Sequence, residues 1–220
     1  MRRIHKSLIA CLVTMVLLLG TASFAYARPE FYLGVSEAYN SINTTATDIH
    51  FTDGYENEYE TVPALDPGNG FSVTFGMEFT TCALELGLTS SHHDGTDSDG
   101  FHANADYAIF DANFKKFIGE SDSVKPYLLI GLCVTSLNVD DGSTNGYYAK
   151  TEDATFSGVG INLGYGLELK FSNIALKGEA IYRTVEYTSV SGVDTYDERL
   201  DEDDFDGNGL CFNVGVNLYF

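Results

Sequence analysis

The stretch Gly70–Thr80 reads GFSVTFGMEFT, and its side chains separate into two rows of different polarity. One row is Phe71, Val73, Phe75, Met77 and Phe79, and the other is Ser72, Thr74, Gly76, Glu78 and Thr80. Successive side chains of a β-strand point to opposite faces, so strict alternation with a period of two predicts a strand with one apolar face.

Two further stretches repeat this design. In Gly158–Phe171 and Gly209–Phe220, every second residue is an aliphatic or aromatic one, and the residues between are mostly glycine, asparagine or charged residues. Each stretch is long enough for a full strand, and neither shows the spacing of an amphipathic helix.

Less regular alternation elsewhere completes a set of eight predicted strands. We expect them at about 31–39, 70–80, 83–91, 105–115, 125–137, 156–171, 174–187 and 209–220. Short connections near 81–82, 116–124 and 172–173 alternate with long polar ones at 40–69, 92–104, 138–155 and 188–208. The predicted fold is therefore all-β, an eight-stranded antiparallel up-and-down arrangement with four long loops at one end.

The polar rows decide which face lies inside. They hold glycine, small residues and charges of both signs, which suits the narrow interior of a closed eight-stranded barrel. The apolar rows would then face lipid, and closure would leave no unpaired sheet edge in hydrocarbon. Tyr39, Tyr187, Tyr219 and Phe220 lie near strand ends, where membrane barrels carry interfacial aromatic residues. The charged residues expected inside are Glu78, Glu85, Asp111, Glu168, Lys170, Lys177, Glu179 and Arg183.

The first 27 residues have the pattern of a cleaved signal peptide. Basic residues precede the uncharged run Leu8–Leu19, and Ala25-Tyr26-Ala27 fits a cleavage site. Residues 28–220 are then expected to form the barrel domain. The whole chain carries 12 basic and 32 acidic residues, for a net charge of −20, which argues against a nucleic-acid partner.

Three segments carry a resemblance to a known family. They are Lys125–Gly131 (KPYLLIG), Gly158–Phe171, and the terminal Asn213–Phe220 (NVGVNLYF). The chain resembles the eight-stranded outer-membrane β-barrels related to the transmembrane domain of outer-membrane protein A and to the opacity proteins. The resemblance implies a Gram-negative outer membrane, contact with lipid and lipopolysaccharide, and Tyr219 and Phe220 as part of the signal recognised by the barrel-assembly machinery.

Two groups of polar residues could bind a metal ion. His50, His92, His93 and His102 fall in predicted long loops, and His92-His93-Asp94 lies near Asp99 and His102, but no spacing matches a zinc signature. The acidic run at 201–206 includes Asp204 and Asp206, and a loose Ca²⁺ or Mg²⁺ site is one reading of it. A solvated charge run is the other reading, and no cofactor is expected.

The inward charges near one tight turn predict an ion-paired cluster. Glu168 and Lys170 precede the turn at 172–173, and Lys177, Glu179 and Arg183 follow it on the next strand. Charges removed from water persist when they are paired. We therefore expect these five side chains to form a salt-bridge cluster that plugs the barrel, with water-lined charges in a narrow pore as the alternative.

These features favour a non-enzymatic, monomeric outer-membrane barrel that contributes to membrane structure and contacts its surroundings through long acidic loops. Two other functions remain open: a narrow pore for small solutes, and a lipid-active enzyme. Single-channel conductance would reveal the pore, and loss of lipid A modification in a His102→Ala variant would reveal the enzyme. No ligand for the loops is identified by the sequence.

Overall fold

The computed structural model describes residues 29–43, 47–53, 56–62, 64–96, 102–119, 121–140, 154–191 and 207–220, and these consist of β-strands joined by short turns. No helix in these ranges is long and apolar enough to span a membrane. The strands are β1 (Glu30–Asn43), β2 (Thr47–Asp53), β3 (Glu56–Val62), β4 (Ala64–Leu65), β5 (Gly68–Glu78), β6 (Cys82–Thr96), β7 (His102–Phe117), β8 (Val124–Asp140), β9 (Ala154–Phe171), β10 (Ile174–Ser191) and β11 (Asn208–Tyr219).

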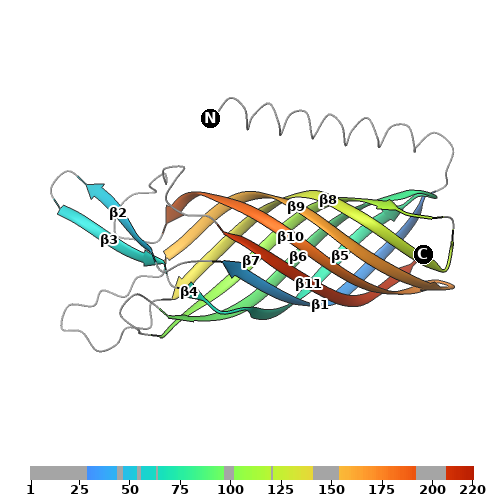
Figure 1. Ribbon diagram of the computed structural model, residues 1–220, viewed down its shortest axis with the longest axis horizontal. Helices are drawn as coiled ribbons and strands as arrows, with labels where there is room; N and C mark the ends of the chain where they lie inside the picture. Colours follow the sequence, from blue (N-terminus) through green and yellow to red (C-terminus); the bar gives the residue numbers. More distant parts are fainter. Residues whose placement is uncertain are drawn as a thin grey trace, which may run out of the picture.

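Eight of these strands close into one antiparallel barrel, as the sequence predicts (Figure 1). The hydrogen-bonded order is β6-β5-β1-β11-β10-β9-β8-β7, and pairing of β6 with β7 closes the ring. The connections at 79–81, 118–123 and 172–173 lie at one end, which we call the turn end. The β2–β3 hairpin projects beyond the other, which we call the hairpin end (Figure 1).

An apolar belt surrounds the barrel. On β11 it runs without interruption from Leu210 near the hairpin end to Phe220 at the turn end, and similar rows lie on the other strands. Leu, Val and Phe side chains in these rows are between 37% and 71% exposed, which is the reverse of a water-soluble core. The belt matches the lipid-facing surface of a transmembrane barrel.

Towards the hairpin end, the polarity of the two rows is inverted. On β8, Leu132 and Val134 point outward within the belt, whereas Leu137 and Val139 are buried inside the barrel. Their outward neighbours are polar, such as Asp140. The strands therefore continue past the belt as an ordinary barrel, with an apolar interior and a polar surface.

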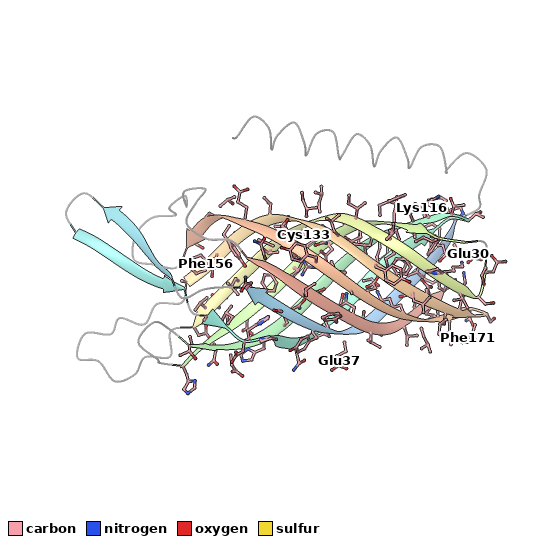
Figure 2. All side chains as sticks on the ribbon, in the orientation of Figure 1. Glu30, Glu37, Lys116, Cys133, Phe156 and Phe171 are labelled. Atoms are coloured by element: carbon pink, nitrogen blue, oxygen red, sulfur yellow. The ribbon has the colours of Figure 1, made fainter. Side chains whose placement is uncertain are left out.

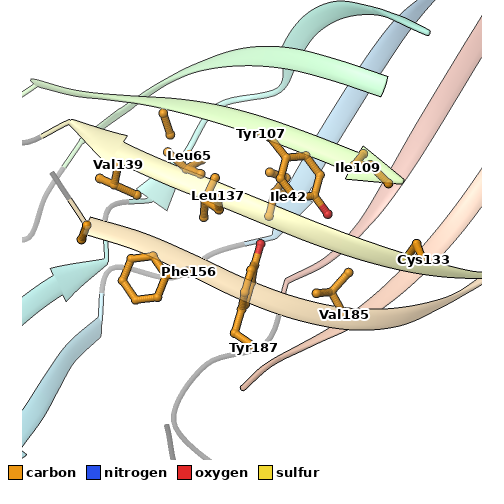
Figure 3. Close-up of a cluster of buried hydrophobic side chains, with 12 residues drawn as sticks. Ile42, Leu65, Tyr107, Ile109, Cys133, Leu137, Val139, Phe156, Val185 and Tyr187 are labelled. Atoms are coloured by element: carbon orange, nitrogen blue, oxygen red, sulfur yellow. The ribbon is translucent and has the colours of Figure 1, made fainter. Parts of the chain in front are cut away.

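The interior near the hairpin end is filled by a group of buried residues that we call the apolar cap. Its two tyrosines point toward the middle of the group, and Leu65 of β4 joins it from the barrel wall beside β6 (Figure 3). All members are at most 8% exposed. They are Ile42, Leu65, Ala105, Tyr107, Ile109, Cys133, Leu137, Val139, Ala154, Phe156, Val185 and Tyr187.

The prediction that all four histidines lie in long loops is wrong. His50 belongs to β2, His92 and His93 to β6, and His102 to β7. The predicted loop 40–69 also contains β2, β3 and β4. The cause is the inverted polarity beyond the belt. Strands whose outward side chains are polar lack the lipid-facing apolar pattern, and their sequence therefore resembles that of loops.

Two of the four aromatic residues expected at the membrane interface lie inside the barrel instead. Tyr187 belongs to the apolar cap, and Tyr219 is 6% exposed at the turn end. Tyr39 and Phe220 do face outward, and Phe220 stacks on Phe31 with ring centroids 6.5 Å apart. A position near the end of a strand does not by itself show whether the side chain points outward or inward.

Three cysteines of the described part of the chain, Cys82, Cys133 and Cys211, are free and buried. They lie on β6, β8 and β11, and their exposed fractions are at most 3%. A buried thiol packs as a small apolar group. This agrees with the odd number of cysteines that remains after residue 27, which cannot form a complete set of disulfides.

One carboxylate interrupts the belt. Glu37 points away from the barrel (Figure 2), between Phe71 of β5 and Val214 of β11 in the strand register. Two further apolar residues of β11, Phe212 and Leu210, pair with β1 on the hairpin-end side of Glu37. Glu37 therefore lies within the belt and not above it.

Replacing Glu37 with leucine is expected to stabilise the barrel in lipid by about 1–2 kcal/mol, because an acidic side chain is unfavourable on a lipid-facing surface. Urea unfolding in lipid vesicles measures the change. Glu186→Leu is the control, since Glu186 faces outward beyond the polarity inversion of β10. Equal effects of the two substitutions would contradict the placement of the belt.

Candidate functional site

The centre of the barrel holds four charged side chains of alternating sign, the middle ion cluster: Glu85, Lys115, Lys177 and Glu179. Lys115 Nζ lies 2.7 Å from Glu85 Oε2 and 2.7 Å from Glu179 Oε1. Lys177 Nζ lies 3.7 Å and 3.6 Å from the same two carboxylates. The four side chains are only 1–2% exposed, so each charge is compensated by another side chain and not by bulk water.

Neutral groups complete the hydrogen bonding of this cluster. The Tyr32 hydroxyl donates to Glu85 at 2.9 Å, and the Tyr127 hydroxyl donates to Glu179 at 2.7 Å. Asn213 donates to the other oxygen of Glu179 at 3.3 Å. These contacts join β1, β8 and β11 to the charges on β6, β7 and β10, so the network crosses the lumen.

A second group, the turn-end ion cluster, lies below it. Lys170 contacts Glu30 at 2.5 Å and Glu78 at 3.4 Å, and Lys125 also pairs with Glu78. The Tyr219 hydroxyl donates to Glu78 at 2.6 Å and also to Glu168. Glu30 marks this end in Figure 2.

A third group lies between the middle ion cluster and the apolar cap. Arg183 donates to Asp111 at 3.2 Å and, through Nε, to Asn162 at 2.9 Å. The Asn162 amide in turn donates to Asp111 at 2.6 Å and to Asn113 at 3.0 Å. The guanidinium and its carboxylate are thus held in a fixed geometry at a site that is 4–5% exposed.

The five charges expected in one cluster are divided among these three groups. Lys177 and Glu179 lie in the middle, Glu168 and Lys170 at the turn end, and Arg183 pairs with Asp111. Sequence reasoning missed Lys115, which contacts two carboxylates. Asp111, Asn113 and Lys115 alternate along β7 and all point inward, so this alternation indicates that Lys115 lies inside the barrel. The adjacent Lys116 points outward, and two consecutive lysines make the inward one hard to identify from sequence.

The polar outer surface above the belt carries a histidine–aspartate pair. His92 Nδ1 lies 2.9 Å from Asp106 Oδ1, and both side chains are exposed. The hydrogen bond to Asp106 raises the pKa of His92, with smaller contributions from the charges of Asp94 and Asp140. In the described part of the chain, no group of three or more histidine, cysteine or acidic residues is placed to hold a metal ion. Asp204 and Asp206 lie outside the described residues.

A serine–histidine pair lies inside the same end of the barrel. Ser91 Oγ is 3.0 Å from His93 Nε2, and His93 Nδ1 is 3.0 Å from the carbonyl oxygen of Asp66. A nucleophilic serine would need this contact to a base. Ser91 and His93 are only 3% and 0% exposed, and the other ring nitrogen of His93 is bonded to the backbone of Asp66, so the contact fits a structural tie better than a reactive site.

The comparisons with known proteins agree with this architecture. Residues 9–220 match the family model described as outer membrane protein beta-barrel domain. No curated protein matches the chain.

Solved structures resemble the barrel at low sequence identity. Neisserial surface protein A is 15% identical with a TM-score of 0.53, and the match covers 86% of this chain and 97% of that one. The outer membrane protein OprG from Pseudomonas aeruginosa is 14% identical with a TM-score of 0.59, over 89% of this chain and 97% of that one. At these identities the likeness establishes the fold.

Proposed function

The chain belongs to the outer membrane protein β-barrel family and lies in the outer membrane, and on that basis we propose that it is a closed, non-enzymatic barrel that supports the membrane and displays acidic elements at the cell surface. The proposal places the turn end toward the periplasm and the hairpin end outside the cell. It also treats the barrel as a monomer whose outer surface meets lipid and lipopolysaccharide.

The filled interior is the observation that carries this proposal. From the turn end upward, the lumen holds the turn-end ion cluster, the middle ion cluster, the Arg183–Asp111 group and the apolar cap. A water-filled channel needs a continuous polar path, whereas the apolar cap places buried aliphatic and aromatic side chains across the lumen. The interior therefore favours a structural plug over a solute pore.

With the lumen filled, contact with the surroundings falls to the hairpin end. The β2–β3 hairpin extends beyond the barrel (Figure 1). Its sequence from residue 47 to residue 62 contains five acids and no Lys or Arg. Such a segment is suited to basic protein surfaces, or to divalent cations that bridge it to lipopolysaccharide phosphates.

Binding to immobilised poly-lysine tests the role of the hairpin. The triple variant Glu56→Gln/Glu58→Gln/Glu60→Gln is expected to bind at least several-fold more weakly than the unchanged protein at low salt. The control variant Asp201→Asn/Glu202→Gln/Asp203→Asn removes the same charge from another segment. Equal weakening in both variants would show that only net charge matters and would contradict a dedicated role for the hairpin.

A further inference from the structure

Residues 64–68, which we call the strap, continue the line of β5 along the barrel wall at the hairpin end, with a one-residue shift of register against β6. Ala64 and Leu65 form β4, which pairs with Thr96 and Gly95 of β6. The Asp66 amide donates to the Asp94 carbonyl at 2.7 Å. Leu65 inserts its side chain into the apolar cap and is 8% exposed. The strap is thus part of the barrel wall beside β6, and its Leu65 side chain contributes to the apolar cap.

His93 ties the strap to the barrel through a chain of hydrogen bonds with a fixed direction. A carbonyl oxygen only accepts, so the His93 Nδ1 that faces Asp66 must carry the proton. Nε2 of the neutral ring is then an acceptor and receives the Ser91 hydroxyl at 3.0 Å. Ser91 in turn accepts from the Asn40 amide at 3.0 Å. These hydrogen bonds connect β1, β6 and the strap.

The His93 ring also packs tightly against the strap. A Cβ atom added to Gly68 would lie 2.2 Å from the His92 carbonyl oxygen and 2.7 Å from two carbon atoms of the His93 ring, so glycine is needed for the close approach of both. The Tyr107 ring meets His93 edge-on, with centroids 6.1 Å apart. The ring is 0% exposed, so a charge on it would have no contact with bulk water.

The geometry points to a pH-sensitive fastening: we propose that neutral His93 holds the strap in the barrel wall, the closed state, and that protonation of His93 releases it from β6, the open state. A second ring proton would place an N–H against Ser91, whose own proton would then lose its acceptor. The imidazolium would also be buried without direct contact to a carboxylate. Release of the strap lets water reach the ring and withdraws Leu65 from the apolar cap.

The charges around His93 set the direction of the effect. Burial lowers the pKa of His93 and dominates, although the hydrogen bond to the Asp66 carbonyl raises it. His92 on β6 lowers the pKa further, whereas Asp94 on β6 and Asp106 on β7 raise it. Inside the barrel, Arg183 lines a small pocket together with Asn40 and Tyr107. The Asp66 carboxylate lies on the exposed strap.

Because the pKa of the closed state is the lower one, the open state binds the proton more tightly. Closure is complete above the ordinary histidine pKa of about 6.5 and weakens as the pH falls below it. One linked proton raises the ratio of open to closed strap by at most about tenfold per pH unit, until the lowered pKa is reached.

Nuclear magnetic resonance of the ¹⁵N-labelled full barrel in lipid nanodiscs tests the proposal. Two quantities are followed from pH 7.5 to pH 5: the protection of the Asp66 amide against hydrogen exchange, corrected for the intrinsic rate, and the titration of the His93 ring. We expect protection to fall below pH 6.5 in the unchanged protein and in His92→Gln, which removes the exposed neighbouring histidine. We expect constant protection in His93→Gln, because glutamine does not titrate.

Three results would overturn the proposal. They are a His93 midpoint at or above 6.5, a protection factor that stays constant while the ring titrates, and an unchanged decline of protection in His93→Gln. If His93→Gln does not fold, the first two observations on the unchanged protein decide the matter without it.

Discussion

Replacing Lys115 with methionine is expected to lower the free energy of unfolding by about 3–5 kcal/mol, the range for breaking a buried ion pair from one side. Lys115 contacts both Glu85 and Glu179 at 2.7 Å, whereas Lys177 reaches them only at 3.6–3.7 Å. The variant would leave two buried carboxylates with one more distant cation. Urea unfolding in lipid vesicles measures the loss. The chain has no tryptophan, so the folded fraction is read from the electrophoretic mobility of unheated samples.

Lys116→Met is the matched control, because it makes the same chemical change one residue further along β7. Lys116 points outward and is exposed, so its replacement is expected to change stability by less than about 1 kcal/mol. Adding Glu85→Gln to Lys115→Met should recover part of the loss, since it removes one of the uncompensated charges. Equal effects of the two lysine variants would contradict the inward phase of β7.

Replacing Gly166 with alanine is expected to destabilise the barrel by roughly 2–5 kcal/mol, through overpacking and the loss of a hydrogen bond to a charged group. The Tyr127 ring lies directly over the Gly166 backbone, and a methyl group there would overlap ring atoms. The ring would have to move, which breaks its 2.7 Å hydrogen bond to Glu179 and its contact with Lys115, 4.9 Å from the ring centroid.

Gly178→Ala is the control for this substitution. Gly178 faces outward on β10, and a Cβ atom there would meet nothing within 4 Å, so stability should change by less than about 0.5 kcal/mol. The double variant Gly166→Ala/Tyr127→Leu is expected to be less destabilised than the sum of its single variants, because the smaller side chain removes the overlap. Strict additivity would show that the ring and the glycine are independent.

The regular alternation in Gly70–Thr80, Gly158–Phe171 and Gly209–Phe220 predicted β5, β9 and β11 and the closed barrel. The alternation identifies these strands because one row of side chains faces lipid and is apolar, whereas the other row faces the narrow interior and is small or polar. Above the belt the outside is water, and the same strands carry Leu137 and Val139 inward. The period of two persists there, but the polarity is inverted, so a pattern of outward apolar residues predicts loops where the strands in fact continue.

The sequence predicts which charged residues point into the barrel along each strand, but it does not predict which of them pair across the lumen. Lys177 and Glu179 share a strand, and their inward positions follow from alternation alone. The contact of Lys115 with Glu179 joins β7 and β10, which are separated by β8 and β9 in the sheet order. Such a contact depends on the register of every strand pair between them, and no local pattern fixes that register. The hydrogen bond from His93 to the Asp66 carbonyl, 27 residues away in the sequence, is non-local in the same way.

Single-channel recording of the refolded protein in planar lipid bilayers tests the central claim, that the three ion-paired groups and the apolar cap close the lumen. Folding of the inserted protein is established first by its heat-dependent change in electrophoretic mobility. The closed interior predicts no long-lived conductance steps at neutral pH. A stable, large conductance from the folded, unchanged protein would contradict it.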